Sequence, residues 1–198
     1  PNQPAKRVSA GDQSTDEMAH LWLELLPRGA GDRRRELEEA VMRHRLERDP
    51  LDFEANFNLG VVMLSRLNAA SAEAALRTAV RVRPDRADAH NMLGLALAGT
   101  GRSAEALEQY QRALELRPGY SGARLNRANA LLKGGRLEDA IEDYRAVLQA
   151  APGDPLPKQE LARALLMRAR QLNAEGKAED AQRSIDEAHT LDPRTPVR

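Results

Sequence analysis

Histidine side chains are the first candidates for metal binding or acid–base chemistry in this chain. The four histidines are His20, His44, His90 and His189, and they stand far apart in the sequence. None of them has the HExxH spacing that places two metal ligands on one helical face. The chain also has no cysteine, which excludes a disulfide framework, a thiolate zinc site and a thiol nucleophile. We therefore expect no metal, no cofactor and no catalytic residue.

Glycine and carboxylate patterns give no stronger support to an enzyme. The sequence contains no GxxxxGK[ST] phosphate loop, no GxGxxG turn after a strand and no GxSxG nucleophile elbow. Seven acidic residues stand among arginines at helical spacing, which is typical of solvated helix faces with i,i+4 ion pairs. These acidic residues are Glu105, Glu108, Glu115, Glu138, Asp139, Glu142 and Asp143. The sequence predicts a protein that is not an enzyme.

The charge balance also argues against a nucleic-acid partner. The 30 Lys and Arg residues are matched by 30 Asp and Glu residues, so the formal net charge is zero. A basic run at residues 33–35 is followed at once by Glu36, Glu38 and Glu39, which cancel most of its field. Only 3% of the residues are aromatic, which leaves few rings to stack on bases. We expect a protein or peptide partner and no nucleic acid.

The sequence says less about the chain termini and the cellular compartment. No stretch approaches the roughly 18 apolar residues of a membrane span, so we expect no membrane span. The chain begins at Pro1, and residues 1–16 are polar and without periodicity, which predicts a flexible lead-in. This start suggests a processed protein or a piece of a longer one. The excess of arginine over lysine hints at a bacterial source, and both a cytoplasmic protein and one exported after processing fit the sequence.

Prolines recur at a fixed spacing along most of the chain. Pro50, Pro84, Pro118 and Pro152 stand 34 residues apart, and Pro193 follows 41 residues later. Such a period indicates a repeat architecture. Aligned on the prolines, residues 53–86, 87–120 and 121–154 share small residues at repeat positions 8 and 20 and a larger residue at position 24. These are Gly60, Gly94 and Ala128 at position 8, Ala72, Ala106 and Ala140 at position 20, and Leu76, Tyr110 and Tyr144 at position 24.

The shared positions predict a hairpin of two antiparallel helices in each repeat. Small residues let the two helices approach closely, and the larger residue fills the space beside them. Proline ends the second helix because it has no N–H and disfavours helix in the preceding residue. Gly101 and Gly135 mark the turns, and the first repeat has Leu67-Asn68 there. We expect Asn68 to tolerate the left-handed conformation that glycine adopts elsewhere.

The pattern resembles that of tetratricopeptide repeat proteins, most clearly in LGLALAGTGRSAEALEQYQRALELRP (93–118). The resemblance covers residues 53–193 and implies a right-handed α-solenoid of helix-turn-helix units, with about ten helices in all. Two departures are Arg127 at position 7, where the family has an aliphatic residue, and a polar residue at position 4 in place of Trp or Tyr. The position 4 residues are Asn56, His90 and Arg124.

The regular units are flanked by altered ones. Residues 155–193 form an expected fourth unit whose first helix runs long, over about 156–175, because seven extra residues precede it. Apolar residues at helical spacing predict helices over 17–27 and 32–48. We interpret residues 17–52 as a degenerate N-terminal pair or cap, which an array needs because terminal hairpins cannot bury both faces. Residues 194–198 are expected to form a C-terminal tail.

The family resemblance implies that first helices line a concave groove. Its predicted binding residues are Phe57, Asn58, Val61, Asn91, Met92, Leu95, Leu125, Asn126, Asn129 and Lys133. A side-chain amide has two donors and an acceptor, which suit the backbone of an extended peptide. Asparagine is a poor helix former, so its recurrence within helices favours a role in recognition. The alternative is that these asparagines only solvate the surface or cap local backbone groups.

The predicted function is therefore a module without catalytic activity that binds a peptide or protein segment in the groove. Two alternatives stay open at this stage. One is a scaffold that self-assembles, weakly, through its ends or its convex face. The other is the accessory region of a larger enzyme or cofactor-bearing protein whose chemistry lies upstream of Pro1.

Overall fold

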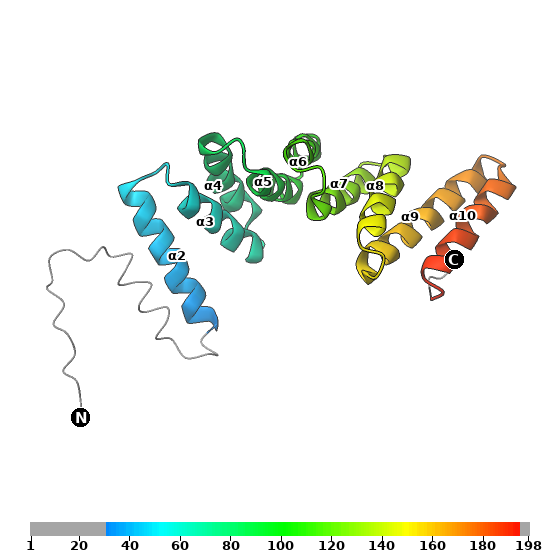
Figure 1. Cartoon of the computed structure of the whole chain (residues 1–198), viewed down its shortest axis with the longest axis horizontal. Coiled ribbons are helices and arrows are strands. Elements are labelled where there is room, and N and C mark those ends of the chain that lie inside the picture. The colour runs from blue at the N-terminus through cyan, green and yellow to red at the C-terminus, as the bar shows by residue number, and fades with distance from the viewer. Residues whose placement is uncertain (1–30, 195–198) are drawn as a thin grey trace, which may run out of the picture.

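Helical hairpins follow one another along the longest axis of the molecule (Figure 1). The structure is a computed structural model that describes residues 31–194, with side chains from Glu36 onward. Across that range every regular element is an α-helix, so the prediction of an all-α solenoid is confirmed. The expected lead-in over 1–16, the expected helix over 17–27 and residues 195–198 lie outside the described residues.

Nine helices span residues 31–194. They are α2 (Gly31–Arg48), α3 (Phe53–Ser65), α4 (Ala69–Val82), α5 (Ala87–Gly99), α6 (Ser103–Leu116), α7 (Ser121–Lys133), α8 (Leu137–Ala150), α9 (Pro155–Ala174) and α10 (Ala178–Leu191). The helices expected over 32–48 and 156–175 correspond to α2 and α9. From α3 onward, consecutive helices pair into hairpins, in which α3, α5, α7 and α9 are the first helices and α4, α6, α8 and α10 the second.

Glycine at the centre of a first helix lets the second helix pack against its backbone. A Cβ atom added to Gly60 would lie 2.4 Å from Leu76 Cγ, and one added to Gly94 would lie 2.6 Å from Tyr110 Cε1. Both distances are too short for carbon atoms that are not bonded, so only glycine fits between these helices as they stand. Leu76 and Tyr110 are fully buried as a result. The predicted pairing of a small residue with a large one is present in both hairpins.

A turn of three residues joins the two helices of each hairpin, and its middle residue has a positive φ. These residues are Leu67 (φ 58°), Gly101 (81°), Gly135 (76°) and Gly176 (75°). We expected Asn68 to adopt this conformation in the first hairpin, and that expectation is wrong. Asn68 has a φ of −94°, and its side chain accepts a hydrogen bond from Ser71 N at the start of α4. Asn68 is therefore the N-cap, and Leu67 adopts the left-handed conformation.

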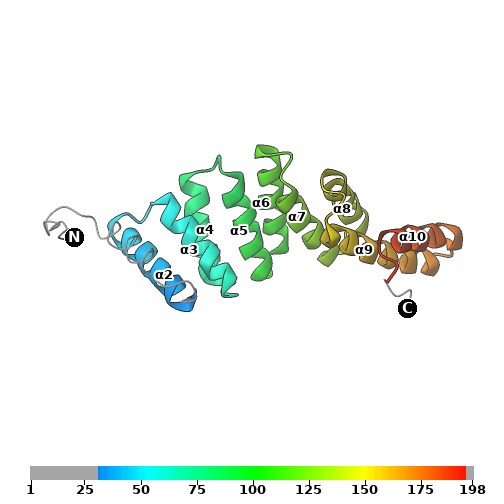
Figure 2. The same ribbon diagram turned by 60° about the horizontal axis from the view of Figure 1, so that its bottom comes forward.

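The hairpins stack through two kinds of contact. First helices pack on one another, α3 on α5 and α5 on α7, and each second helix packs on the first helix that follows it. In a curved array the layer whose neighbours approach each other lies on the inner side, so α3, α5 and α7 form the concave layer. Figure 2, turned by 60° from Figure 1, shows the same succession of hairpins.

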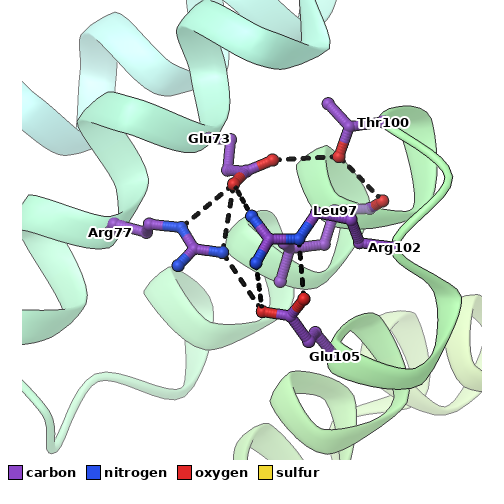
Figure 3. A network of polar contacts seen from close by, with 6 residues as sticks. All are labelled: Glu73, Arg77, Leu97, Thr100, Arg102 and Glu105. Atoms are coloured by element: carbon purple, nitrogen blue, oxygen red, sulfur yellow. Dashed lines mark hydrogen bonds and ion pairs between the residues drawn. The ribbon is translucent and has the colours of Figure 1, made fainter.

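Polar side chains also join neighbouring hairpins (Figure 3). Glu73 on α4 accepts hydrogen bonds from Thr100 Oγ1 at 2.9 Å and Arg102 Nη1 at 2.5 Å, both from the turn between α5 and α6. Arg77 donates to Glu73 at 3.1 Å and to Glu105 on α6 at 3.2 Å. Two arginines thus lie between two carboxylates, which ties the first regular hairpin to the second.

Helix α2 lies in the place of a second helix. Glu39 accepts a hydrogen bond from Arg43 at 2.9 Å and contacts Arg66 in the turn after α3. Glu39 and Arg43 precede Glu73 and Arg77 by 34 residues, so the same kind of contact recurs one period earlier. Met42, which precedes Leu76 by 34 residues, is also buried. The repeat register therefore extends into α2, although its sequence departs from the pattern at other positions.

Candidate functional site

The candidate site is the concave layer, and its ten predicted residues lie on α3, α5 and α7. They differ in accessibility. Asn58, Val61, Leu95 and Lys133 are exposed, and Phe57, Met92, Leu125, Asn126 and Asn129 are half-buried. Asn91 is only 2% exposed. The structure thus places nine of these side chains where a ligand can touch them and one where it cannot.

Asn91 forms a bridge inside the layer. Its Nδ2 donates to Tyr120 Oη at 3.2 Å, and its Oδ1 accepts from Asn126 Nδ2 at 3.0 Å. The prediction that Asn91 is exposed in the groove is therefore wrong, because its amide is used to join α5 to α7. The bond uses one of the two N–H groups of Asn126. Asn91 thus positions the half-buried amide of Asn126, which has further capacity to donate and accept.

Asn129 is held in a similar way by a side chain of its own hairpin. Its Oδ1 accepts a hydrogen bond from Tyr144 Oη at 2.5 Å. Tyr144 lies on α8 and is fully buried, so its hydroxyl requires this partner. Burial also raises the pKa of Tyr144 to about 12. Because this bond uses the amide oxygen, the N–H groups of Asn129 can still donate to a ligand.

Aromatic rings occupy the N-terminal part of the layer. Phe57 stacks on Phe53, with ring centroids 5.8 Å apart and an interplanar angle of 14°. The guanidinium of Arg86 lies over Phe53, 4.8 Å from the ring centroid, and also forms an ion pair with Asp88 at 2.7 Å. The hydrogen bond from Arg86 holds the pKa of Asp88 below its usual range. Phe57 is thus fixed by packing, and one part of its ring remains accessible.

Apolar side chains on neighbouring first helices complete the site. Val61 on α3 is 37% exposed and Leu95 on α5 is 38% exposed. Met92 and Leu125 are half-buried because they also pack against the hydrophobic core. The arrangement can bury apolar side chains of a ligand and donate hydrogen bonds from amides nearby.

The histidines are not brought together. His44, His90 and His189 lie on α2, α5 and α10, and His20 lies outside the described residues. Between residues 31 and 194, no group of three His, Cys, Asp or Glu side chains is placed to hold a metal ion. None of the nine helices in that range is both long and apolar enough to cross a lipid bilayer.

The repeats match a known family. The family model for the tetratricopeptide repeat matches residues 64–121 and 99–155. Residues 64–155 therefore belong to the tetratricopeptide repeat family. No curated protein matches the sequence.

Solved structures share this fold at low sequence identity. The crystal structure of MamA is 21% identical, covers 85% of this chain and 98% of its own, and has a TM-score of 0.66. A second MamA structure is 19% identical, covers 90% and 93%, and has a TM-score of 0.70. YrrB, described as a tetratricopeptide repeat protein with an unusual peptide-binding site, is 21% identical, covers 92% and 85%, and has a TM-score of 0.64.

The polar residues at position 4 of the tetratricopeptide repeats have a common role that the sequence analysis missed. Asn56 Nδ2 donates to the Pro50 carbonyl at 3.0 Å, and Arg124 Nη2 donates to the Pro118 carbonyl at 2.9 Å. His90 Nε2 lies 3.0 Å from the Pro84 carbonyl. Three chemically different side chains thus reach the carbonyl six residues earlier, in the turn that follows the preceding helix. The sequence could have indicated this role, because each of the three polar residues follows a proline by six positions.

Arg127 at position 7 is explained by a buried partner. Asp143 on α8 is 3% exposed and receives two hydrogen bonds from Arg127, from Nε at 2.7 Å and from Nη2 at 2.6 Å. The expectation that Asp143 belongs to a solvated face is therefore wrong. The carboxylate raises the pKa of Arg127, since the hydrogen bonds favour the charged guanidinium. The equivalent positions in the first regular repeat hold the apolar residues Leu59 and Ala75.

Proposed function

We propose that this protein is an interaction module that holds a peptide or protein segment on the concave face of α3, α5 and α7. The observation that carries the proposal is the presence of partly exposed apolar side chains beside fixed side-chain amides on neighbouring first helices. Val61 and Leu95 are the exposed apolar residues, and Asn126 and Asn129 supply the amides. The fold that the chain shares with YrrB, a protein with a peptide-binding site, adds support.

Recognition would divide between two kinds of contact. Leu95, Val61 and the accessible part of Phe57 would bury apolar side chains of the ligand, which supplies most of the affinity. Asn126 and Asn129 would donate hydrogen bonds to ligand carbonyl groups. Both amides are already held by Asn91 and Tyr144, so little side-chain entropy is lost on binding. Asn91 and Tyr144 are positioning residues in this arrangement.

A selection from a library of displayed random peptides tests the proposal. The full chain serves as the target, and the selected peptides are then titrated against purified variants. Leu95→Glu places a charge on the concave face, and we expect it to weaken binding about tenfold or more because a buried charge must be desolvated. Asn129→Ala should weaken the same peptides by a smaller factor.

The matched control is Leu67→Glu. Leu67 is also an exposed leucine, but it lies in the turn between α3 and α4, away from the concave layer. This variant should bind the selected peptides like the wild type. Equal weakening by Leu67→Glu and Leu95→Glu, or no weakening by Leu95→Glu, would overturn the proposal.

A further inference from the structure

Helix α9 carries a stripe of residues that continues the concave side of the first helices. It has 20 residues, whereas α7 has 13, and the seven extra residues are close to two helical turns. Counted from the proline before each helix, Arg163 corresponds to Asn129, and counted from the glycine turn after each helix, Arg170 does. Because these two alignments differ by nearly whole turns, both place the same residues on the concave side. The residues are Leu156, Glu160, Arg163, Met167 and Arg170.

The packing of Tyr144 shows which part of α9 lies beside Asn129. Tyr144 on α8 donates a hydrogen bond to Asn129 on α7 at 2.5 Å. It also belongs to a buried cluster that contains Leu161 and Leu165, which stand two positions before and after Arg163. These two leucines face the core, so Arg163 between them lies on the exposed side of the same turn. Arg163 is therefore the neighbour of Asn129 on the next first helix.

Lys133 and Arg163 provide two positive charges at this end of the concave layer. Lys133 follows Asn129 by four residues on α7, and Met167 follows Arg163 by four residues on α9, so each stands one turn further along its helix. Lys133, Arg163 and Met167 are exposed. Across residues 36–194, neither Lys133 nor Arg163 forms an ion pair. We call Asn129, Lys133, Arg163 and Met167 the basic patch.

Glu160 lies next to the basic patch and reduces its charge. It is half-buried and stands three residues before Arg163. Burial is the main cause of the raised pKa of Tyr144, which Glu160 raises further and Arg163 lowers, so both charges act on this hydroxyl. A single carboxylate offsets at most one of the two cations. The basic patch therefore keeps a positive field that a ligand can meet.

The first and second helices of the C-terminal hairpins carry opposite charge. Helix α9 has four basic residues and one acidic residue. Helices α8 and α10 each have four acidic residues and one arginine. The zero net charge of the chain thus conceals a separation between layers, which attracts an acidic segment to the first helices and repels it from the second.

The N-terminal end of the concave layer offers apolar side chains instead. Val61 and Leu95 are exposed there. The nearby cation, Arg86, forms an ion pair with Asp88 at 2.7 Å and lies 3.9 Å from Glu54. A segment that crosses the layer therefore meets apolar contacts at one end and cations at the other.

We propose that the segment held on the concave face is acidic, with Asp or Glu side chains that contact Lys133 and Arg163 while its apolar side chains contact Val61 and Leu95. This inference rests on the proposed function, because it assigns a chemistry to the same ligand. The guanidinium of Arg163 can bind a carboxylate through two parallel hydrogen bonds. The N–H groups of Asn129 can donate to the same carboxylate or to the adjoining backbone.

Peptides selected from the random library on the full chain are the probes for this inference. They should contain more Asp and Glu than the library, together with apolar residues. Their affinity should fall as the NaCl concentration rises, because salt screens exposed charges. Replacement of an Asp or Glu in a selected peptide by Asn or Gln should weaken binding about threefold for each carboxylate that meets a cation.

Substitutions in the basic patch test the same contacts from the side of the protein. Arg163→Gln and Lys133→Gln should each weaken the selected peptides about threefold, and the double variant about tenfold. Arg163→Lys keeps the charge and should bind more tightly than Arg163→Gln. The matched control is Arg183→Gln, which removes the same charge from α10 in the same hairpin, where 73% of the side chain is exposed. The control should bind like the wild type, and circular dichroism checks that all variants are folded.

The results separate this inference from the proposed function. Peptides that are weakened by Leu95→Glu but not by the double variant would overturn the acidic segment and leave the concave site in place. An effect that disappears when the peptide C-terminus is amidated would also overturn it, since the terminal carboxylate would then be the group bound. So would a single-stranded oligonucleotide that displaces the peptides and is weakened by the same two substitutions, because the patch would then bind phosphates. Failure to select any peptide would overturn both proposals.

Discussion

At the scale of single residues, the third repeat has a charged pair at two positions where the first repeat has apolar residues. Arg127 and Asp143 occupy positions that hold Leu59 and Ala75 in the first repeat. Asp143 is almost wholly buried, and Arg124 Nη1 lies 3.7 Å from it in addition to Arg127. A buried ion pair contributes little net stability, but removal of Arg127 would leave the buried Asp143 with only the more distant Arg124 as a partner.

Arg127→Leu is therefore expected to lower the free energy of unfolding by about 2–3 kcal/mol. The double variant Arg127→Leu/Asp143→Ala restores the composition of the first repeat and should lie within about 1 kcal/mol of the wild type. Urea unfolding followed by circular dichroism measures both values. A double variant as unstable as Arg127→Leu alone would contradict this account of the pair.

Tyr144 predicts a stability loss at alkaline pH. Burial raises its pKa to about 12, against about 10 for tyrosine in the unfolded chain. The folded state therefore binds this proton more tightly, so the contribution of Tyr144 is complete below pH 10 and is lost as the pH rises towards 12. Tyr144→Phe should lose about 1 kcal/mol at pH 7, because its bond to Asn129 is absent, and decline less steeply above pH 10. Urea unfolding at pH 8 to 11 tests this, and parallel curves for both proteins would argue against it.

At the scale of elements, the turns determine how sharply each hairpin closes. All four described hairpins place one residue in the left-handed region, and in the first this residue is Leu67. A side chain there brings Cβ close to a backbone carbonyl, which glycine avoids. Leu67 is also exposed, so its side chain contributes little burial to offset this strain.

Leu67→Gly should consequently raise the free energy of unfolding by about 1 kcal/mol, since it removes the strain without loss of core contacts. Asn68→Ala in the same turn should lower it by about 1 kcal/mol, because the N-cap bond to Ser71 is lost. Thermal and urea unfolding of both variants provide the measurement. A destabilised Leu67→Gly protein would show that the leucine side chain has a contact that matters more than its backbone strain.

At the scale of the whole molecule, stability depends on contacts between hairpins, because each unit packs only on its neighbours. Carboxylates take part in these contacts at two successive junctions. A hydrogen bond from Arg43 holds the pKa of Glu39 below its usual range, and one from Arg102 does the same for Glu105. Glu39 contacts the turn after α3, and Glu105 contacts Arg77 on α4.

These lowered pKa values predict acid sensitivity. The unfolded chain takes up protons first, at its usual pKa of about 4.3, so the stabilisation by Glu39 and Glu105 is present above that pH and is lost as the pH falls through their lower folded values. The urea midpoint should be constant between pH 7 and about 5 and fall below about 4. Glu105→Gln should reduce this fall, and Glu108→Gln, on the same helix, serves as the comparison. An identical acid profile for the wild type and Glu105→Gln would contradict the assignment.

Much of the fold could be predicted from the sequence because its signals are local. The recurring prolines and the pairing of Gly94 with Tyr110 depend only on contacts within one unit or between adjacent units. They can therefore be predicted from the repeat spacing in the sequence. The long α9 followed from seven extra residues for the same reason. Positive φ at Leu67 was not predicted, because propensity favours asparagine there and the register of the hairpin overrode it.

The sequence by itself determined the α-hairpin array and predicted which residues of each first helix line the groove. The tertiary structure alone decided which groups on that side are accessible. Asn91 was indistinguishable from Asn126 by residue type, yet one is buried and the other half-buried. Burial depends on what neighbouring hairpins place against a side chain, here Tyr120 and Asn126. Those contacts join residues about one repeat apart, and the repeat pattern that predicts the helices does not contain them.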